Sequence, residues 1–568
     1  MAGKNMEGKN MAGKNDCVKI LDTIPQYLTT RARETPDRLW LKDRQGDQFT
    51  TWTWAQAEQE SNAAAAWLEQ RYGNSQTVFG MLSRNRAHWM LADMAITASG
   101  NVSVPLFTTL LPDTAEYILK FCDAKVLFVG ESGNWSAVKQ ILPPAIEIVA
   151  LPGVDPEVDH IKWETMVAEG KDRKPSHTCK PDDLQTLVFT SGTTGVPKGV
   201  MQSHASMLKP MQRCVGAVEI SDYPRFLSYL PLAHVAERQL IWIQSLIYGG
   251  EITFNEDLTT LLRDMADTKP HYLFGVPRVW EQLQQGVLAQ FGGQAAFDDA
   301  LQKDRQAVQQ KVITALGLQN AEYLLTAAAP TPAALIDWYQ NIGITLMEGY
   351  GQSEAMGLIA NTGDARKVGS IGIPLDGVEV RINDDGELCV RAEGLATGYY
   401  KNPEKTAETF VEGWVHTGDK ATVDDDGFYY LTGRVKDHFK TMQGKFVSPP
   451  PMESAFSECE VVEQLCLLGR GYSKTVMVVV LTSLAGTLQK SDVEQQLLTT
   501  AASVNEGVEH HAHIGAVIVT TEPWTIENGI LTPTMKIKRD EIEAAHGVQA
   551  QLLATRAAVE KHILVEWV

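Results

Sequence analysis

A glycine- and hydroxyl-rich loop between an apolar run and a lysine is the strongest chemical signal in this sequence. The apolar residues 187–189 lead into Thr190, Ser191, Gly192, Thr193, Thr194 and Gly195, and Pro197 and Lys198 follow. Backbone N–H groups, hydroxyls and an ammonium group can converge on phosphate oxygens in such a loop. A Walker A loop needs glycine directly before the lysine and serine or threonine after it, whereas Pro197 and Gly199 flank Lys198. The loop therefore predicts a phosphate cradle and argues against a P-loop kinase or GTPase.

A second motif combines an aromatic ring with a carboxylate. The apolar residues 344–347 are followed by Glu348, Gly349, Tyr350, Ser353 and Glu354. We expect the chain to bend on its glycines and to expose Tyr350 as a flat surface for a purine. Glu354 would supply an oxygen ligand of the kind that Mg²⁺ prefers. A glycine-rich turn with Tyr350 packed in the core is the alternative.

A third candidate is the carboxylate of Asp419, which follows a Thr-Gly pair. We expect a turn there, and the two carboxylate oxygens suit the paired hydroxyls of a ribose. A carboxylate that only caps the turn is the alternative.

Two other clusters are interpreted as structural. The histidines His510, His511 and His513 have no cysteine or carboxylate partner set typical of zinc sites, so a surface cluster is favoured over a metal site. The three prolines at 449–451 are interpreted as a rigid connector.

The elements that must position these groups alternate along the chain. Strand-like runs at residues 76–82, 125–129, 184–189 and 344–347 alternate with helix-like stretches at 54–71, 112–121 and 257–267. Such alternation predicts parallel βαβ units with helices on both faces of the sheets. Period-two patterns at 378–390 and 421–431, each interrupted by an Asp- and Gly-containing turn, predict antiparallel hairpins.

The predicted fold class is therefore α/β. We expect a disordered tail at residues 1–15, where a Gly-Lys-Asn unit repeats, and a large N-terminal domain at 16–434. That domain would combine βαβ-type sheets with helices and a β-rich section. Residues 435–568 have their own mixed pattern and predict a small, mobile α+β C-terminal domain.

Composition excludes some classes of function. The 50 Lys and Arg against 70 Asp and Glu give a formal net charge of −20, which would repel nucleic acid, so no nucleic-acid partner is expected. The seven cysteines include no C-x-x-C pair, which fits a reducing compartment better than a disulfide framework. We expect a cytoplasmic protein. Peripheral contact with the inner membrane face and the oligomeric state are left open.

Six motifs follow one another along the chain. They are the loop at 187–200, Tyr-Leu-Pro-Leu-Ala-His at 229–234, Glu-Gly-Tyr-Gly-Gln-Ser-Glu at 348–354, Trp-Val-His-Thr-Gly-Asp at 414–419, Gly-Arg-Val-Lys-Asp at 433–437 and Thr-Pro-Thr-Met-Lys-Ile-Lys-Arg at 532–539. In this order they resemble the motifs of the AMP-forming acyl-adenylate superfamily, which includes acyl-CoA synthetases, luciferases and peptide-synthetase adenylation domains. The resemblance covers nearly the whole chain after the tail. Two departures are Ser353, where Thr is usual, and the Ala-Ala-Ala-Pro of 327–330, where Ser or Gly is common before Ala-Pro.

The resemblance implies a role for each motif residue. Contacts to ATP or AMP would come from Thr190, Ser191, Gly192, Thr193, Thr194, Gly195, Lys198, Glu348, Gly349, Tyr350, Ser353, Asp419, Arg434 and Lys536. Thr190 and Glu354 would hold Mg²⁺. The catalytic candidates are Lys198, Lys536 and His234, with His234 at the mouth of the acyl pocket. The hinge would be Lys436 and Asp437, and the CoA channel would include Lys440 and Gly444.

Segments at 273–281, 444–449 and 531–539 look most like long-chain fatty acyl-CoA synthetases. The resemblance thus implies ATP-dependent activation of a long-chain fatty acid to acyl-AMP, release of pyrophosphate, and transfer to CoA. Mg²⁺, ATP and CoA are the expected cofactor and co-substrates. The alternatives are a ligase that loads a carrier protein or another acceptor, a medium-chain or aryl acid CoA ligase, and a catalytically silent relative that binds an acyl chain.

Overall fold

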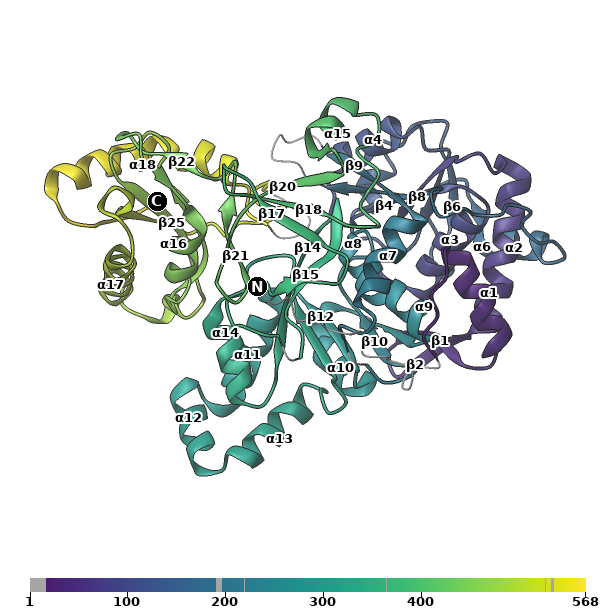
Figure 1. Cartoon of the computed structure of the whole chain (residues 1–568), viewed down its shortest axis with the longest axis horizontal. Coiled ribbons are helices and arrows are strands. Elements are labelled where there is room, and N and C mark those ends of the chain that lie inside the picture. The colour runs from purple at the N-terminus through teal and green to yellow at the C-terminus, as the bar shows by residue number, and fades with distance from the viewer. Residues whose placement is uncertain (1–16, 191–196, 219, 364, 527, 533–535) are drawn as a thin grey trace, which may run out of the picture. The chain divides into compact units, whose positions relative to one another are not determined.

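The computed structural model describes residues 17–190, 197–218, 220–363, 365–526, 528–532 and 536–568 (Figure 1). The tail expected at residues 1–15 lies outside the described residues. The chain forms two compact units. The large unit contains the described residues of 17–190, 197–380 and 390–415, and the small unit contains those of 381–389 and 416–568. The predicted boundary after Arg434 lies within the small unit and stays a prediction.

The residues at the two ends of the glycine-rich motif, Thr190 and Lys198, lie on the last two strands of one sheet of the large unit. Its strand order is β7–β6–β5–β3–β4–β8–β9, parallel except for the antiparallel pair β8 and β9. The strands β3 and β4 are buried along their whole length, as expected for parallel strands covered on both faces. The bounds are β3 (Val78–Leu82), β4 (Val102–Leu106), β5 (Val126–Val129), β6 (Glu147–Ala150), β7 (Ile161–Lys162), β8 (Leu184–Thr190) and β9 (Lys198–Ser203).

A second sheet of the large unit carries the aromatic motif. Its order is β16–β15–β14–β13–β12–β10–β11–β1–β2, with parallel pairing from β14 to β1 and antiparallel strands at both ends. The bounds are β1 (Leu39–Gln45), β2 (Gln48–Thr53), β10 (Arg225–Ser228), β11 (Glu251–Phe254), β12 (Tyr272–Gly275), β13 (Tyr323–Thr326), β14 (Leu346–Gln352), β15 (Ala355–Ala360) and β16 (Ile373–Pro374).

Helices cover both sheets, which confirms the predicted α/β class. They are α1 (Ile24–Glu34), α2 (Trp54–Tyr72), α3 (Ala87–Ala98), α4 (Pro112–Phe121), α5 (Trp135–Val138), α6 (Trp163–Gly170), α7 (His204–Cys214), α8 (Val235–Glu237), the π-helix η1 (Arg238–Ile243), α9 (Gln244–Tyr248), the 3₁₀-helix η2 (Leu258–Thr260), α10 (Leu261–Thr268), α11 (Pro277–Phe291), α12 (Gln294–Lys303), α13 (Arg305–Ala315), α14 (Ala333–Asn341) and α15 (Pro403–Thr409).

Local sequence signals account for several helix ends. The helix α2 begins after Thr53, whose hydroxyl accepts from the Gln56 N–H at 3.3 Å while the Gln56 side chain accepts from the Thr53 N–H at 2.9 Å, a capping box. The segment predicted as helix at 257–267 differs at its start. There the Asp257 carboxylate accepts from the Thr259 N–H at 2.8 Å, and the first turn is the tighter η2.

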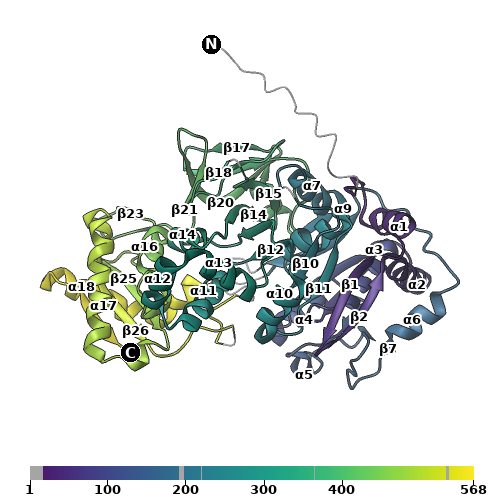
Figure 2. The same ribbon diagram turned by 90° about the horizontal axis from the view of Figure 1, so that it is seen from below.

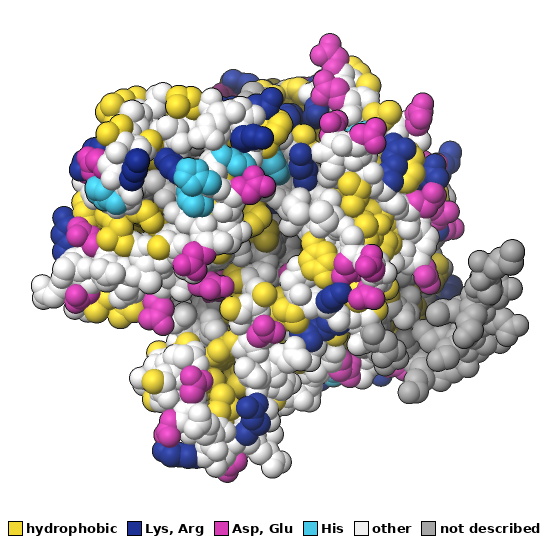
Figure 3. All heavy atoms as spheres, turned by 60° about the vertical axis from the view of Figure 1, so that its left-hand side comes forward, with side chains coloured by type: hydrophobic (Ala, Val, Ile, Leu, Met, Phe, Trp, Pro, Cys, Tyr) yellow, Lys and Arg dark blue, Asp and Glu magenta, His cyan; other side chains and the backbone are white. Residues whose placement is uncertain are grey.

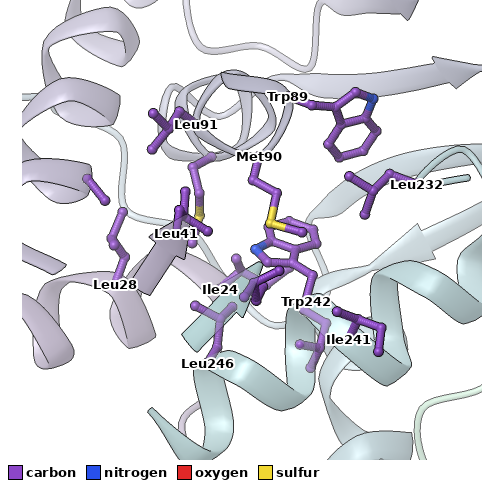
Figure 4. Packing of buried hydrophobic residues seen from close by; sticks show 14 of the residues in the cluster. Ile24, Leu28, Leu41, Trp89, Met90, Leu91, Leu232, Ile241, Trp242 and Leu246 are labelled. Carbon is purple, nitrogen blue, oxygen red and sulfur yellow. The ribbon is translucent and has the colours of Figure 1, made fainter. Parts of the chain in front are cut away.

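One hydrophobic core joins the two sheets of the large unit. Side chains from strands of both sheets belong to a single buried cluster, together with residues of α3, α7, η1 and α9. Figure 4 shows Trp89 of α3 beside Leu232, and Met90 of α3 beside Trp242. Burial of such side chains supplies the main favourable term in folding and fixes the sheet edges that carry the motifs.

The β-rich section forms a separate sheet of order β17–β18–β20–β19, with β21 paired to β20. Its strands are β17 (Glu379–Ile382), β18 (Glu387–Arg391), β19 (Phe410–Val411), β20 (Trp414–Val423) and β21 (Tyr429–Arg434). The antiparallel pairing of β20 and β21 confirms the hairpin predicted at 421–431.

The C-terminal part of the small unit is a sheet of order β24–β25–β26–β27, with α17 and α18 on opposite faces (Figure 1; the turned view is Figure 2). The elements are β22 (Phe439–Lys440), β23 (Phe446–Val447), α16 (Pro449–Phe456), β24 (Val462–Leu468), β25 (Thr475–Leu481), η3 (Ala485–Thr487), α17 (Lys490–Glu506), η4 (His510–Ala512), β26 (Ile514–Thr520), α18 (Arg539–Glu560) and β27 (Leu564–Trp567). The rigid connector expected at 449–451 is wrong, because the three prolines form the first turn of α16. Proline is tolerated there because the first N–H groups of a helix have no partner within it.

Lys and Arg side chains are interspersed with Asp and Glu over the face in Figure 3. Within the described residues, no helix combines the length and apolarity needed to cross a membrane.

Candidate functional site

The strands β8 and β9 place the two ends of the glycine-rich loop opposite each other. Thr190 and Lys198 are direct partners in the antiparallel ladder. Lys198 is half-buried. The predicted residues Ser191, Gly192, Thr193, Thr194 and Gly195 lie outside the described residues. The structure thus brings the first hydroxyl and the lysine of the motif together.

A tyrosine that the sequence analysis missed links this hairpin to Glu354. The segment 398–400 pairs with β9, because the Met201 N–H donates to the Gly398 carbonyl at 2.9 Å and the Tyr400 N–H donates to the Gly199 carbonyl at 2.8 Å. Within that segment the Tyr399 hydroxyl donates to Glu354 Oε1 at 2.6 Å. Glu354 is therefore held by a residue that pairs with the strand of Lys198.

The oxygen donors of Glu354 and Thr190 are chemically suited to Mg²⁺, the ion that the motifs imply. A carboxylate and a hydroxyl are the hard oxygen ligands that this ion takes. The Tyr399 hydroxyl orients one carboxylate oxygen of Glu354, which is the usual arrangement behind a metal-binding carboxylate. No signal in the sequence singles out Tyr399, which is separated from Glu354 by 45 positions.

The motif at 348–354 differs in part from the expected bend. The strand β14 continues through Gly349 and Tyr350 to Gln352, with Gly349 paired to Ala360, and the chain turns at residues 353 and 354 instead. Gly349 lies in regular cross-strand pairing, whereas the pairing register shifts between Tyr350 and Gln352, at the position of Gly351. Tyr350 is only 9% exposed, as in the alternative with a packed tyrosine, and its contact with adenine stays a prediction.

The buried carboxyl of Glu348 precedes these glycines. It lies at the end of the parallel pair of β13 and β14, opposite Thr326. Burial raises its pKa to about 7, partly offset by a hydrogen bond from the Gly369 backbone and by the charge of Arg366. Ser353 is also buried, and its carbonyl accepts from the Gln202 side chain at 2.5 Å.

The unusual loop at 327–330 contains backbone strain. Ala328 has φ +71°, a left-handed conformation that suits glycine rather than a residue with a Cβ atom. The two threonines that flank the loop, Thr326 and Thr331, join their hydroxyls at 2.9 Å. Ala328, which stands where Ser or Gly is common, therefore has a strained backbone conformation.

His234 has a local structural role. It is the N-cap of α8, where its Nδ1 accepts from the Ala236 N–H at 3.1 Å. The next carboxyl, Glu237, is fully buried and was missed by the sequence analysis. It accepts from the Ser228 hydroxyl at 2.7 Å and from the Tyr229 N–H at 3.1 Å, and burial raises its pKa to about 8.

In the small unit, Asp419 and Arg434 are direct partners across β20 and β21. The Arg434 Nε donates to Asp419 Oδ1 at 2.7 Å, and the Asp419 side chain is 13% exposed. The turn expected at Thr417 and Gly418 is wrong, because both residues lie inside β20, where Gly418 has φ +72°.

The remaining predicted residues of the small unit lie in turns and hairpins. Lys436 and Asp437 directly follow β21, where the Asp437 N–H donates to the Arg434 carbonyl at 3.2 Å. Lys440 ends β22, and Gly444 has φ +72° in the turn between β22 and β23.

Lys536 is exposed, and its backbone is hydrogen-bonded to Thr532. The Thr532 N–H donates to the Lys536 carbonyl at 2.8 Å, and the Lys536 N–H donates to the Thr532 hydroxyl at 3.0 Å. These bonds fix the backbone from which the lysine side chain projects.

Known proteins match nearly the whole chain. Residues 28–400 match the family model described as AMP-binding enzyme, and residues 436–547 match the AMP-binding enzyme C-terminal domain. The long-chain-fatty-acid–CoA ligase FadD15 of Mycobacterium bovis is 28% identical over 91% of this chain and 94% of that protein. The peroxisomal long chain acyl-CoA synthetase 7 of Arabidopsis thaliana is 26% identical over 91% of this chain and 82% of that protein.

Solved structures share the fold. The A-PCP didomain of carboxylic acid reductase from Segniliparus rugosus, in complex with AMP, has a TM-score of 0.79 at 22% identity and covers 96% of this chain and 84% of that chain. The anthranilate CoA ligase AuaEII, in complex with anthranoyl-AMP, has a TM-score of 0.75 at 22% identity and covers 93% of this chain and 98% of that chain.

Proposed function

Since this chain belongs to the AMP-binding enzyme family, we propose that it activates a long-chain fatty acid with ATP and transfers the acyl group to CoA. The first step forms acyl-AMP and pyrophosphate, and the second forms acyl-CoA and AMP. The observation that carries the choice of acid is the end-to-end similarity to a long-chain-fatty-acid–CoA ligase, 28% identity over 91% of this chain.

Charge neutralisation is the main task of the chain in the first step. A fatty carboxylate attacks the α-phosphate of ATP, and both reactants are anions, so cations aimed at the developing charge lower the barrier. We assign this task to Lys198 in the large unit and Lys536 in the small unit. The loop between β8 and β9 would hold the phosphates, and Asp419 would accept hydrogen bonds from the ribose.

The ion implied by the family is Mg²⁺. Glu354 and Thr190 would hold it, and when bound it offsets the negative charge of the phosphates. The chain's own contribution is orientation, because the Tyr399 hydroxyl fixes one oxygen of Glu354 at 2.6 Å.

The second step needs a different arrangement of the C-terminal residues. Acyl-AMP is a reactive mixed anhydride that must be shielded from water until a thiol attacks its carbonyl. We propose that residues 435–568 rotate about Lys436 and Asp437, which removes Lys536 and brings up the hairpin of Lys440 and Gly444 to guide the pantetheine arm. Such steps are known to gate turnover in enzymes with mobile domains.

A carrier protein is the second candidate acceptor. It is favoured by the likeness to a didomain that contains an A domain and a PCP, at a TM-score of 0.79. The anthranilate CoA ligase with a TM-score of 0.75 keeps aryl acids as a further alternative. A catalytically silent relative is disfavoured, because Lys198, Glu354, Asp419 and Lys536 are all present. A cytoplasmic location and collection of the acid at a membrane surface stay proposals.

One experiment tests the proposal. The protein is incubated with MgATP and either benzoate or saturated acids of two to eighteen carbons, with and without CoA, and pyrophosphate, AMP and thioester are measured. We expect AMP rather than ADP, thioester only with CoA, and kcat/KM that rises with chain length, because each buried methylene is worth about 0.8 kcal/mol. ADP as the product would refute adenylation, and a maximum at acetate or benzoate would refute the choice of acid.

A further inference from the structure

Three side chains with ligand atoms meet on one face of the β-rich section. Glu387 and Cys389 are two positions apart on β18, so they point to the same face of that strand. His416 lies on β20, the neighbouring strand in the sheet. Its Nδ1 is 2.9 Å from Glu387 Oε2 and 3.7 Å from Cys389 Sγ, and the three ligand atoms all lie within 4.8 Å of one another.

The nitrogen–sulfur distance is close to that of a tetrahedral zinc site. With Zn–N of about 2.0–2.1 Å and Zn–S of about 2.3 Å, a tetrahedral angle separates nitrogen and sulfur by about 3.6 Å. The nitrogen–sulfur separation of 3.7 Å matches that value. A thiolate, an imidazole and a carboxylate together suit a borderline-soft ion such as Zn²⁺, rather than Mg²⁺ or Ca²⁺.

The cluster is accessible from one side. The side chains of His416 and Glu387 are 26% and 16% exposed, whereas Cys389 is buried behind them. An ion can therefore enter past the imidazole and the carboxylate, and water can fill the fourth position. Binding would release the thiol proton to solvent, because the thiolate is the form that binds metal.

We propose that Glu387, Cys389 and His416 form a Zn²⁺ site, and that the ion weakens binding of the adenine nucleotide. The zinc site itself rests only on these three residues. The effect on the nucleotide rests on the proposed function, in which Asp419 binds ribose.

The link to the nucleotide is a hydrogen bond. The second oxygen of the same carboxylate, Glu387 Oε1, accepts from the Gly418 N–H at 2.9 Å, and Gly418 directly precedes Asp419. In a tetrahedral site the histidine nitrogen and the carboxylate oxygen are about 3.4 Å apart, whereas they are now 2.9 Å apart. The carboxylate must therefore move by about half an ångström to bind the ion, which strains its bond to Gly418.

The first test uses cobalt as a spectroscopic substitute for zinc. The full-length protein is titrated with Co²⁺ while the absorbance band produced by a thiolate–cobalt bond is recorded. Zn²⁺ is then added to displace the Co²⁺, which gives the affinity for Zn²⁺. We expect one ion per chain. Cys389→Ser should abolish the band and weaken Zn²⁺ binding at least about 100-fold, beyond the 10–100-fold typical of supporting residues. His416→Asn should weaken binding similarly, with an unchanged circular dichroism spectrum.

The matched control is Cys459→Ser, which removes another buried thiol of the small unit outside the cluster. It should leave the band and the affinity unchanged. A band that persists in Cys389→Ser, or that disappears in Cys459→Ser, would overturn the assignment, as would the lack of stoichiometric binding by the unaltered protein.

The second test measures AMP binding by calorimetry with and without saturating Zn²⁺; AMP is used because the triphosphate of ATP chelates zinc. Weakening of the hydrogen bond from Gly418 to Glu387 should weaken AMP binding by up to about fivefold, and this effect should vanish in Cys389→Ser. Zinc binding with an unchanged AMP affinity would overturn the coupling. Failure of AMP to bind without zinc would instead refute the proposed function, and the cobalt result would not depend on it.

Discussion

Replacing Tyr399 with phenylalanine removes a single oxygen atom, the donor to Glu354 Oε1 at 2.6 Å. The ring itself is buried and packs against Phe410 with centroids 6.0 Å apart, a contact that phenylalanine keeps. The substitution therefore tests orientation of the carboxylate with little change in packing.

The expected magnitude follows from the charge of the acceptor. A hydrogen bond to a charged group contributes about 1.5–3 kcal/mol, and 1.36 kcal/mol is one decade in an equilibrium or rate constant. If the bond acts mainly to hold Glu354 for Mg²⁺, the Mg²⁺ concentration for half-maximal activity should rise roughly 10–150-fold, a range that overlaps the effect of supporting residues at metal sites.

The assay is pyrophosphate release at saturating ATP and fatty acid over a series of free Mg²⁺ concentrations. Tyr400→Phe is the matched control, because it removes a hydroxyl from the neighbouring residue of the same segment and should leave the Mg²⁺ dependence unchanged. An unchanged Mg²⁺ dependence in Tyr399→Phe would refute the role of Tyr399. Equal shifts in both variants would show that the segment, and not this hydrogen bond, matters.

Three further predictions concern other positions. Lys536→Ala should slow acyl-AMP formation by roughly 10²–10⁴ and spare thioester formation from supplied acyl-AMP, since a cation about 4 Å from a developing charge is worth about 4 kcal/mol at an effective dielectric of 20. Lys436→Pro should slow thioester formation and spare acyl-AMP formation. Equal slowing of both half-reactions by Lys536→Ala would refute the rotation. Ala328→Gly should raise the free energy of unfolding, measured by urea denaturation, by about 1 kcal/mol, because it relieves the strain at φ +71°. A destabilised variant would contradict this. Burial raises the pKa of Glu237 in the folded protein from 4.5 to about 8, so its contribution to stability is fully present below pH 4.5 and is lost as pH rises to 8. In urea unfolding, the free energy of unfolding of Glu237→Gln should fall less over that pH range than that of the unaltered protein. Identical pH profiles would argue against the buried acid.

Features with local causes could be predicted from the sequence. The helix at residues 112–121 coincides with α4, because proline suits its first turn and apolar spacing defines one face. The hairpin of β20 and β21 was recognised because its turn residues interrupt a period-two pattern. Capping, periodicity and turn chemistry act within a few residues, so one stretch of sequence contains the whole signal.

Motif interiors were harder to predict. The glycines at 349 and 351 were expected to bend the chain, yet Gly349 lies in regular pairing with β15 and the ladder is irregular only at Gly351. The prolines at 449–451 were expected to form a connector, yet they start α16. Each of these residue types allows two conformations, and the neighbouring elements decide between them.

Contacts between distant segments were decided only by the tertiary structure. Tyr399 reaches Glu354 because residues 398–400 pair with β9, and Glu387, Cys389 and His416 meet because β18 and β20 are neighbours in one sheet. The sequence determined which chemical groups are available and the class of fold that holds them. Which of these groups meet depends on strand order and register. Both are set by packing of the whole chain and cannot be recognised from the local sequence around each residue.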